Sequence, residues 1–287
     1  SEYLTSTPKY VLLYDAFGWD RPTYVHLPLL MGKNEDGTVS KLSKRHGAVS
    51  FQDLLGDGYL PEAIINYISL LGWCPKNSET EFFDLDGLKA AFTIDGVSKS
   101  PAVFDFEKLL WFNGEYIHKL EDGEFEGIVK PFITTDIPEN VNRTKMLALL
   151  KTRMSKLSEI DEKMSFFITL PEYETELFLN KKNKIADFEI VKAVLNEAKA
   201  VLTNVESFDN DTLFAALMPI AEKLQIKTGT LMWCIRIAVS GMAATPGGAT
   251  EIMEVIGKDE SLFADCIEYS PYMRHRLTLL RLKNMII

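Results

Sequence analysis

Residues 37–47 read GTVSKLSKRHG, a short polar segment with a glycine at each end. Its cations are Lys41, Lys44 and Arg45, and the hydroxyl between them is that of Ser43. Positive groups this close repel one another, and a polyanion among them removes the repulsion. Because glycine is typical of loops, we predict a loop that binds a nucleotide triphosphate. An exposed, solvated run of charge is the alternative, and the flanking sequence decides between the two.

Apolar sequence lies on both sides of this segment. Residues 26–32 read HLPLLMG, which predicts a short buried strand that stops at Gly32. Residues 49–51 return to apolar character, and residues 52–55 begin a helical pattern. A strand, a loop and a helix in this order are typical of the nucleotide-binding edge of an α/β domain, so they favour the nucleotide. His46, next to the cations, is expected only to fill the loop.

The order of HLPLL, a glycine-containing loop and KLSKRHG resembles the second signature (KMSKS) of the class I aminoacyl-tRNA synthetases. Arginine in the fifth place is typical of the glutamyl-tRNA synthetases within that class. The resemblance continues through residues 58–73 and 98–117, and residues 236–258 resemble the last helical domain of the bacterial glutamyl-tRNA synthetases. Between residues 120 and 225, only helical periodicity and length agree.

The first signature of the class I enzymes, His-x-Gly-His, has no counterpart in this sequence. The histidines are His26, His46, His118 and His275, and all of them lie in other contexts. The sequence also opens with Ser1 and enters directly into family-like residues. We therefore expect this chain to be the carboxy-terminal portion of a longer synthetase, and we expect that portion alone to be inactive.

The resemblance implies the ATP-dependent attachment of L-glutamate to tRNA(Glu) through glutamyl-adenylate, with Mg²⁺ accompanying the ATP. It implies that Lys44 is the principal phosphate contact, with Lys41 in support. It also implies that Ser43 helps to hold the loop and that Arg45 contributes to catalysis. Cations that meet the charge shifting onto pyrophosphate stabilise the transition state more than bound ATP. His26 belongs to the family's HLPL pattern and is either a further ATP contact or a hydrogen-bonded structural residue.

The implied macromolecular partner is tRNA, and cations of the helical part are its candidate contacts. The candidates are Arg153, Lys156, Lys181, Lys182, Arg274 and Arg276. The formal net charge of −10 argues against wholesale coating with nucleic acid, and DNA is not expected as a partner. An acidic protein still presents a basic face where its cations gather, so this charge is compatible with tRNA binding.

Two other functions are weighed against this one. The first is a non-catalytic tRNA-binding or interaction module derived from a synthetase, and the second is a relative that charges tRNA with glutamine. A module without ligase activity has no need of the KLSKR sequence. The glutamine enzymes close with β-barrel domains, whereas helical periodicity after residue 140 favours the bacterial glutamyl type.

Beyond residue 60 the chain is predicted to be mostly helical. Pro61 begins an amphipathic helix that ends before Gly72. Apolar spacing predicts a second helix over 146–157 and a third over 190–202, for which Asp187 is the N-cap. Further helices are predicted after Asp209, over 231–243 and over 249–256.

The predicted fold class is mainly α, with a short α/β remnant of a class I nucleotide-binding catalytic domain. The predicted parts are the catalytic remnant (1–52), an all-helical stem-contact region (53–120), and two helical anticodon-binding subdomains (121–208 and 209–287). Trp73 and Trp111 are predicted to be core aromatics, because each lies in a strongly apolar context.

Cysteine usage and hydropathy exclude several classes of protein. The cysteines Cys74, Cys234 and Cys266 lie far apart, so we predict neither a disulfide framework nor a metal site. The most apolar run, 231–244, is interrupted by Arg236 and is too short to cross a bilayer. With no signal peptide before it, we expect a cytoplasmic monomer that does not bind membranes.

Overall fold

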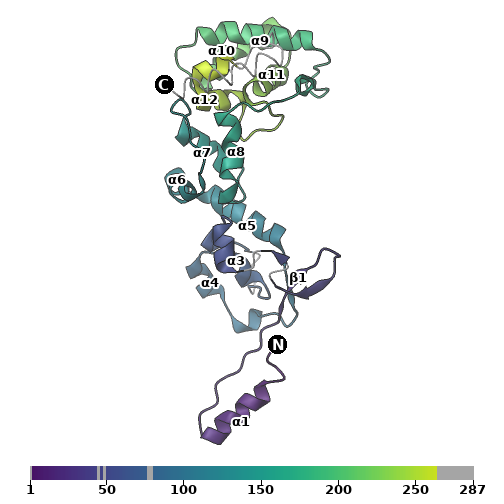
Figure 1. The fold of residues 1–287 in the computed structure, drawn as a ribbon, viewed down its shortest axis with the longest axis vertical. Helices are drawn as coiled ribbons and strands as arrows, with labels where there is room; N and C mark the ends of the chain where they lie inside the picture. Colours follow the sequence, from purple (N-terminus) through teal and green to yellow (C-terminus); the bar gives the residue numbers. More distant parts are fainter. Residues whose placement is uncertain (1, 44–45, 48–49, 76–79, 264–287) are drawn as a thin grey trace. The chain divides into compact units, whose positions relative to one another are not determined.

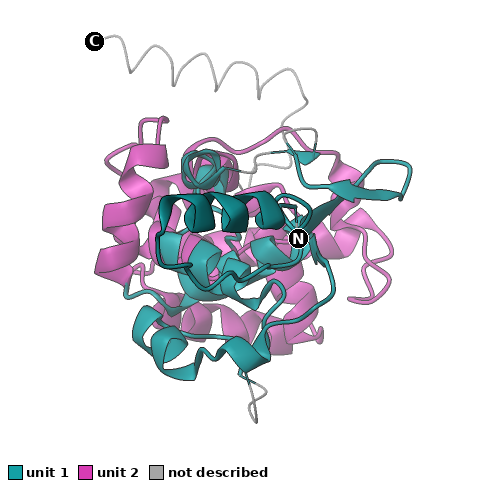
Figure 2. Cartoon of the chain, turned by 90° about the horizontal axis from the view of Figure 1, so that it is seen from below, with its two compact units in different colours: residues 1–121, 154–159 teal, residues 122–153, 160–287 magenta. Residues whose placement is uncertain are grey.

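The computed structural model describes residues 2–43, 46–47, 50–75 and 80–263. The chain divides into two compact units, which Figure 2 shows in different colours. Unit 1 comprises residues 1–121 together with the short segment 154–159, and unit 2 comprises residues 122–153 and 160–287. The four domain ranges expected from the sequence stay a prediction.

A three-stranded sheet lies in unit 1, with the strand order β2-β1-β3 (Figure 1). Its strands are β1 (Leu30–Lys33), β2 (Val39–Lys41) and β3 (Ala102–Phe104). β1 is antiparallel to β2, with Gly32 opposite Ser40, and parallel to β3, with Gly32 opposite Phe104. The turn between β1 and β2 needs a glycine, because Gly37 has a φ of +82°.

The prediction of a buried strand over residues 26–32 is wrong in its extent. The strand begins at Leu30 and runs through Gly32, whereas residues 26–29 belong to no strand. Pro28 has no N–H to donate to a neighbouring strand, which accounts for the late start. Leu27, expected to be buried, is exposed. The cationic segment does leave the end of a strand, but that strand is β2.

Five helices accompany the sheet in the described part of unit 1. They are α1 (Thr7–Phe17), α2 (Phe51–Gly56), α3 (Pro61–Leu70), α4 (Leu85–Ala91) and α5 (Phe106–Lys119), with a 3-10 turn at Ile94–Gly96. α3 confirms the helix predicted from Pro61, which stands in its first turn; Gly72, just beyond its end, has a φ of +84°. α1 differs from α3, because it buries none of its residues.

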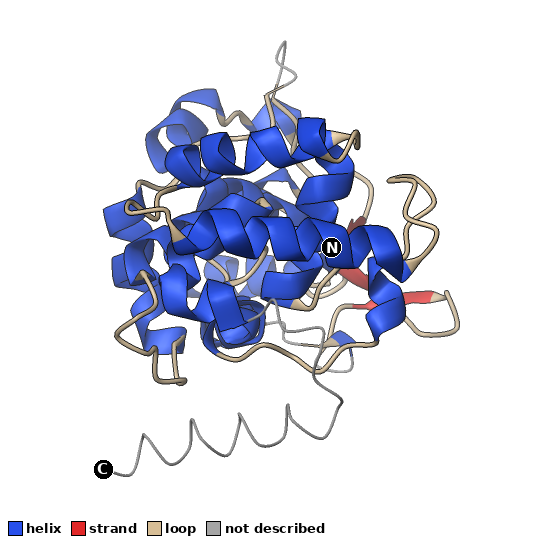
Figure 3. Cartoon of the chain, turned by 90° about the horizontal axis from the view of Figure 1, so that it is seen from above, coloured by secondary structure: helices blue, strands red, loops and turns tan. Residues whose placement is uncertain are grey.

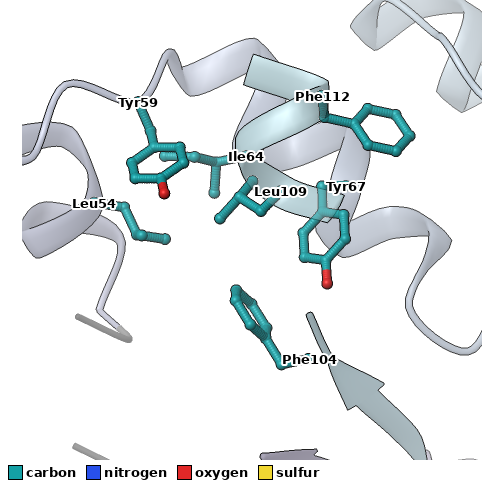
Figure 4. Packing of buried hydrophobic residues seen from close by; sticks show 7 residues of the cluster. All are labelled: Leu54, Tyr59, Ile64, Tyr67, Phe104, Leu109 and Phe112. Atoms are coloured by element: carbon teal, nitrogen blue, oxygen red, sulfur yellow. The ribbon is translucent and has the colours of Figure 1, made fainter. Parts of the chain in front are cut away.

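The core of unit 1 is an aromatic and aliphatic cluster between α2, α3, α5 and β3 (Figure 4). Its members are Leu54, Tyr59, Ile64, Tyr67, Phe104, Leu109 and Phe112. Trp73 is buried, as predicted, but Trp111 is 47% exposed, so its assignment to the core is wrong. On α5 the buried residues include Leu109, Phe112 and Asn113, and a helix turns by about 100° per residue, which places Trp111 nearly opposite the centre of that face.

The described part of unit 2 is helical. Figure 3 shows how far helix predominates over strand in the chain as a whole. The helices of unit 2 are α6 (Asp122–Val129), α7 (Arg143–Lys151), α8 (Ile160–Ile168), α9 (Phe188–Thr203), α10 (Asn210–Lys223), α11 (Thr228–Ser240) and α12 (Ala249–Phe263), with 3-10 turns at Lys130–Phe132 and Thr175–Phe178. α11 packs against α9 and α12, and α10 packs against the same two helices. The N-cap predicted at Asp187 is confirmed, since its carboxylate accepts the N–H of Glu189. The helix predicted after Asp209 is α10, and the structure adds that Asp209 is its N-cap, accepting the N–H of Thr212.

The helix predicted over 146–157 is wrong beyond Lys151. Residues 154–159 return to unit 1, where a 3-10 turn covers Leu157–Glu159. The backbone N–H of Leu157 donates to Gly58 O (3.0 Å), and Ser155 O accepts from the amide of Asn113 (2.6 Å). These partners take the backbone groups that a longer α7 needs.

The mainly α fold class with a small sheet is confirmed. Within the described residues, no helix combines the length and apolarity needed to span a bilayer.

Candidate functional site

Lys41 is the last residue of β2, an edge strand of the sheet. Its Nζ lies 2.7 Å from Oε1 of Glu2, and this bond lowers the pKa of the Glu2 carboxyl. The Lys41 and Glu2 side chains are 59% and 54% exposed, and an ion pair so open to water holds its partners weakly. Lys41 is therefore free to exchange Glu2 for a more highly charged anion.

Ser43 lies two residues beyond β2 and is half-buried. Its backbone N–H donates to Nδ1 of His46 (3.0 Å), and its hydroxyl lies 3.3 Å from the same nitrogen. The other predicted members of the segment, Lys44 and Arg45, lie outside the described residues. The structure therefore brings Lys41 and Ser43 to one edge of the sheet, and it adds His46, which the sequence treated as filling.

His26 lies on the irregular segment before β1 and is exposed. Its Nε2 lies 3.2 Å from the hydroxyl of Thr7, which itself donates to Tyr3 O (2.9 Å). The Thr7 oxygen is thus the acceptor and His26 the donor. Of the two roles weighed for His26, this contact supports the hydrogen-bonded structural residue.

The described candidate contacts for tRNA fall into two groups. Lys156 lies in unit 1 with its Nζ 3.0 Å from Asp57, and its ammonium is 5.9 Å from the centre of the Tyr59 ring. The ion pair with Asp57 supports a structural role for Lys156. Arg153, Lys181 and Lys182 lie in unit 2 and are exposed, and no side-chain hydrogen bond or ion pair joins them to other described residues. The remaining candidates, Arg274 and Arg276, are outside the described residues.

Lys181 and Lys182 are carried by a tightly bonded turn. Asn180 and Ile185 exchange both backbone bonds (3.0 and 2.9 Å), and the side chain of Asn180 accepts the N–H of Asn183 (3.0 Å). The turn is joined to α11, because the Thr230 hydroxyl donates to Asn183 O (2.7 Å). The ammonium groups therefore stand on a defined backbone.

Another face of unit 2 is acidic. A hollow of ≈ 350 Å³ lies between α7, α10 and α12. Its charged lining consists of Lys145, Asp209, Asp211, Glu251 and Glu254. Hydrogen bonds from the Ser207 hydroxyl and from Thr212 hold the pKa of Asp209 below its usual range, so this carboxyl stays charged. Phosphates are repelled from such a surface. No group of three or more metal-ligating side chains gathers among the residues that the structure describes.

Sequence reasoning also missed an exposed aromatic surface in unit 1. Trp111 packs at 5.4 Å from Phe82, measured between ring centres, and the ammonium of Lys119 lies 4.3 Å from the centre of the Phe82 ring. An exposed tryptophan beside a second ring that carries a cation is suited to stacking on a nucleobase. The apolar neighbours of Trp111 in the sequence concealed its exposure.

Two sequence families match the chain. Residues 1–111 match the catalytic domain of the class I tRNA synthetases for E and Q, and residues 124–263 match an anticodon binding domain. Among curated relatives, the glutamate–tRNA ligases of Clostridium tetani and Clostridium kluyveri are each 46% identical over 262 residues. The alignments cover 91% of this chain and 52% and 53% of the relatives. The chain thus spans about half the length of the curated relatives it matches.

Solved structures give the same result. A glutamate tRNA ligase from Elizabethkingia meningosepticum, in complex with its amino acid, matches with a TM-score of 0.77 and 26% identity. The glutamate-tRNA synthetase of Elizabethkingia anophelis matches with a TM-score of 0.78 and 26% identity. Each match covers 92% of this chain and 54% of the other. The chain is thus built from a part that matches the class I tRNA synthetase catalytic domain and a part that matches an anticodon binding domain, and over 91% of its length it is similar to about half of a glutamate–tRNA ligase.

Proposed function

We propose that this chain supplies the KLSKR segment and the tRNA-binding helices of a cytoplasmic glutamate–tRNA ligase. The observation that carries the proposal is the place of Lys41, the last residue of β2, and of Ser43, two residues beyond it, at the edge of the sheet. A cationic segment that leaves a strand end is well placed to meet a nucleotide. The glutamate–tRNA ligases among its relatives support glutamate, rather than glutamine, as the amino acid.

The proposed reaction has two steps. A carboxylate oxygen of L-glutamate attacks the α-phosphorus of ATP, and pyrophosphate leaves with the electron pair of the broken P–O bond. The acyl group then passes from the adenylate to the terminal ribose of tRNA(Glu), and AMP leaves. Mg²⁺ is proposed to arrive with ATP, where it neutralises phosphate charge. Lys41 exchanges Glu2 for an oxygen of the departing pyrophosphate, so its contribution is largest in the transition state.

The first test is ATP–pyrophosphate exchange by the ligase that contains this chain, with glutamate and tRNA(Glu) present. Lys44→Ala is expected to lower kcat about a hundredfold and to change the KM for ATP less, because one preorganised stabiliser of transition-state charge is lost. Lys33→Ala is the matched control, since Lys33 is exposed at the end of β1. Equal exchange rates in Lys44→Ala and wild type refute the assignment.

For tRNA, we propose the turn that carries Lys181 and Lys182 as a phosphate contact of unit 2. The turn is held by Asn180 and Ile185, so little backbone entropy is lost when the two ammonium groups meet the RNA. The acidic hollow between α7, α10 and α12 repels phosphate and turns the RNA away from that face.

Titration with tRNA(Glu) at several salt concentrations tests this surface. Replacing both Lys181 and Lys182 by alanine is expected to reduce the slope of log K against log salt by about 1.5, since each phosphate contact contributes about 0.7–0.9. Lys192→Ala is the control for the loss of an exposed lysine charge outside this turn, since Lys192 lies on α9. If both variants show the wild-type slope of log K against log salt, Lys181 and Lys182 do not contact the RNA.

A further inference from the structure

The β1–β2 turn and the cationic segment are joined by a single side chain, that of His46. Its Nε2 lies 2.9 Å from Oδ1 of Asn34, in the turn, and 3.3 Å from the hydroxyl of Ser40, on β2. Its Nδ1 lies 3.0 Å from the backbone nitrogen of Ser43. Both ring nitrogens are therefore engaged, one on each side.

The direction of each bond follows from the chemistry of the turn. Bonds from the hydroxyl and the N–H of Thr38 lower the pKa of Asp36, so this side chain is a carboxylate that only accepts. Since the Thr38 hydroxyl donates to Asp36, its oxygen accepts from the amide NH₂ of Asn34 (2.9 Å). That bond orients Oδ1 of Asn34 toward His46.

An amide oxygen can only accept, so Nε2 of His46 carries the proton and donates. In the neutral ring Nδ1 is then bare, and it accepts the N–H of Ser43. A continuous series of bonds thus runs from Asp36 through Thr38, Asn34 and His46 to Ser43. It fixes both the tautomer of His46 and the position of the Ser43 backbone.

Close packing holds the ring as well. A Cβ placed on Gly32 would lie 2.6 Å from Cδ2 and Cγ of His46, nearer than real Cβ atoms come to other atoms. The imidazole therefore lies directly on the backbone of β1, and any side chain at residue 32 displaces it. Gly32 does not end the strand, as the sequence suggested; it makes room for the ring.

We propose that His46 is a positioning residue of the cationic segment, which it holds against the sheet by bridging Asn34 and Ser43. The effect of this role on catalysis rests on the proposed function, whereas the bonds of His46 to Asn34 and Ser43 do not depend on it. Holding the first part of the segment in place reduces the conformational freedom lost when its cations meet the departing pyrophosphate. Removing the bridge is therefore expected to slow adenylate formation more than it weakens ATP binding.

The geometry is tested on the chain itself, independently of activity. Long-range ¹H–¹⁵N correlation of the histidine rings is expected to show His46 as the Nε2–H tautomer, and its signal is identified by its loss in His46→Gln. Amide hydrogen exchange of Ser43 is expected to become at least tenfold faster in His46→Ala and in Gly32→Ala. An Nδ1–H tautomer, or unchanged exchange at Ser43, overturns the proposal, because a protonated Nδ1 cannot accept the backbone N–H of Ser43 and would donate to Ser43 O (3.1 Å) or to the Ser43 hydroxyl (3.3 Å) instead.

Kinetics of the ligase that contains this chain test the consequence. His46→Ala is expected to lower kcat for ATP–pyrophosphate exchange about tenfold with less than a twofold change in the KM for ATP. His46→Asn retains an acceptor near Nδ1, and His46→Gln retains a donor near Nε2; each is expected to fall between wild type and His46→Ala. Gly32→Ala leaves the imidazole intact but displaced, and it should match His46→Ala.

Glu35→Ala is the control, since this exposed residue lies in the same turn and its side chain bonds to no other residue in the described ranges. It should behave as wild type in every measurement. A purely structural role of His46 predicts that exchange activity falls only in proportion to the folded fraction, measured by thermal unfolding, and that result overturns the proposal. If the wild-type ligase shows no ATP–pyrophosphate exchange, the proposed function fails. The tautomer of His46 and the amide hydrogen exchange of Ser43 still test whether His46 bridges Asn34 and Ser43.

Discussion

The helices α9–α12 of unit 2 and helix α1 of unit 1 place their apolar side chains in opposite ways. On α11, Leu231 and Ile237 are fully buried, whereas α1 buries no residue and Leu12 on it is 67% exposed. Removal of apolar surface from water is the main source of folding free energy. Unit 2 therefore owes its stability to contacts among its own helices, and α1 contributes little to the stability of the described chain.

Apolar content alone does not explain this difference. Residues 10–17 of α1 read YVLLYDAF, which is as apolar as much of α11. Within unit 1, α3 and α5 bury Ile64, Leu109 and Phe112 in one cluster, so the contrast falls between α1 and the rest of the unit. An apolar helix becomes a core helix only where another element packs on it.

The largest expected effect on stability comes from replacing a leucine by alanine in each of the two regions. Leu231→Ala on α11 is expected to lower the free energy of unfolding by about 3 kcal/mol, because it leaves a cavity in a closed core. Leu12→Ala on α1 should change it by less than about 0.5 kcal/mol. Urea unfolding followed by far-UV circular dichroism measures both.

Trp233 on α11 reports on unit 2 in the same experiment, since its indole donates to Phe178 O (3.0 Å). In Leu231→Ala the fluorescence transition of Trp233 should move to lower urea together with the circular dichroism. If Leu12→Ala costs as much as Leu231→Ala, α1 is packed in solution and the contrast between the two regions is wrong.

A second effect concerns the closed part of unit 1. Asn113 is fully buried on α5, where its amide oxygen accepts the N–H of Leu60 (2.7 Å) and its NH₂ donates to Ser155 O (2.6 Å). Asn113→Ala leaves a buried donor and acceptor without partners, so we expect a loss of about 3 kcal/mol or slightly less. Asn204→Ala, at an exposed helix end, is the control for the same chemical change. A small loss in Asn113→Ala would show that residues 154–159 do not depend on α5.

Local signals in the sequence predicted the elements that local physics determines. Pro61, Asp187 and Asp209 each act on the first turn of their own helix, so their roles can be read without tertiary information. The apolar run before the cationic segment indicated a strand that ends at Gly32, whereas β2, which ends at Lys41, was not predicted. The assignment to the synthetase family came from residues 41–45 and their flanks.

The remaining features depend on contacts between residues distant in sequence. The return of residues 154–159 to unit 1 is fixed by Asn113 and Gly58, about 40 and 100 residues away. The exposure of Trp111 depends on which side of α5 packs against α3. The role of His46 required the bond to Asn34, twelve residues earlier and across a strand pair, and periodicity does not report such a bond.

A third prediction uses alkaline pH to probe the closed core of unit 1. Burial raises the pKa of Tyr67 to about 12, and its hydroxyl donates to Asp105 O (2.8 Å) and accepts the N–H of Asp105 (2.7 Å). In the unfolded chain a tyrosine has a pKa of about 10, so the folded state holds the proton more tightly. The resulting stability is complete below pH 10 and is lost as pH rises toward 12.

The expected loss across that pH range is about 2 kcal/mol in wild type. In Tyr67→Phe this part of the pH dependence should disappear, because no proton remains to be released at residue 67. Urea unfolding of both proteins between pH 9 and pH 11.5 gives the difference, from which the titration of other tyrosines cancels. Parallel stability curves for the two proteins would show that Tyr67 ionises equally in the folded and unfolded chains.

The smallest expected effect comes from the N-terminal first turns of α9 and α1. Asp187 accepts the N–H of Glu189 (3.1 Å) at the first turn of α9, whereas Ser6 forms no side-chain bond at the first turn of α1. Asp187→Ala is therefore expected to cost about 1 kcal/mol, and Ser6→Ala a few tenths or less. Urea midpoints of the two variants measure this difference. Because α1 gains neither burial nor a side-chain N-cap from its own sequence, equal losses would mean that its first turn is stabilised by contacts absent from the described structure, and the contrast with α9 would then lie in the partners of α1.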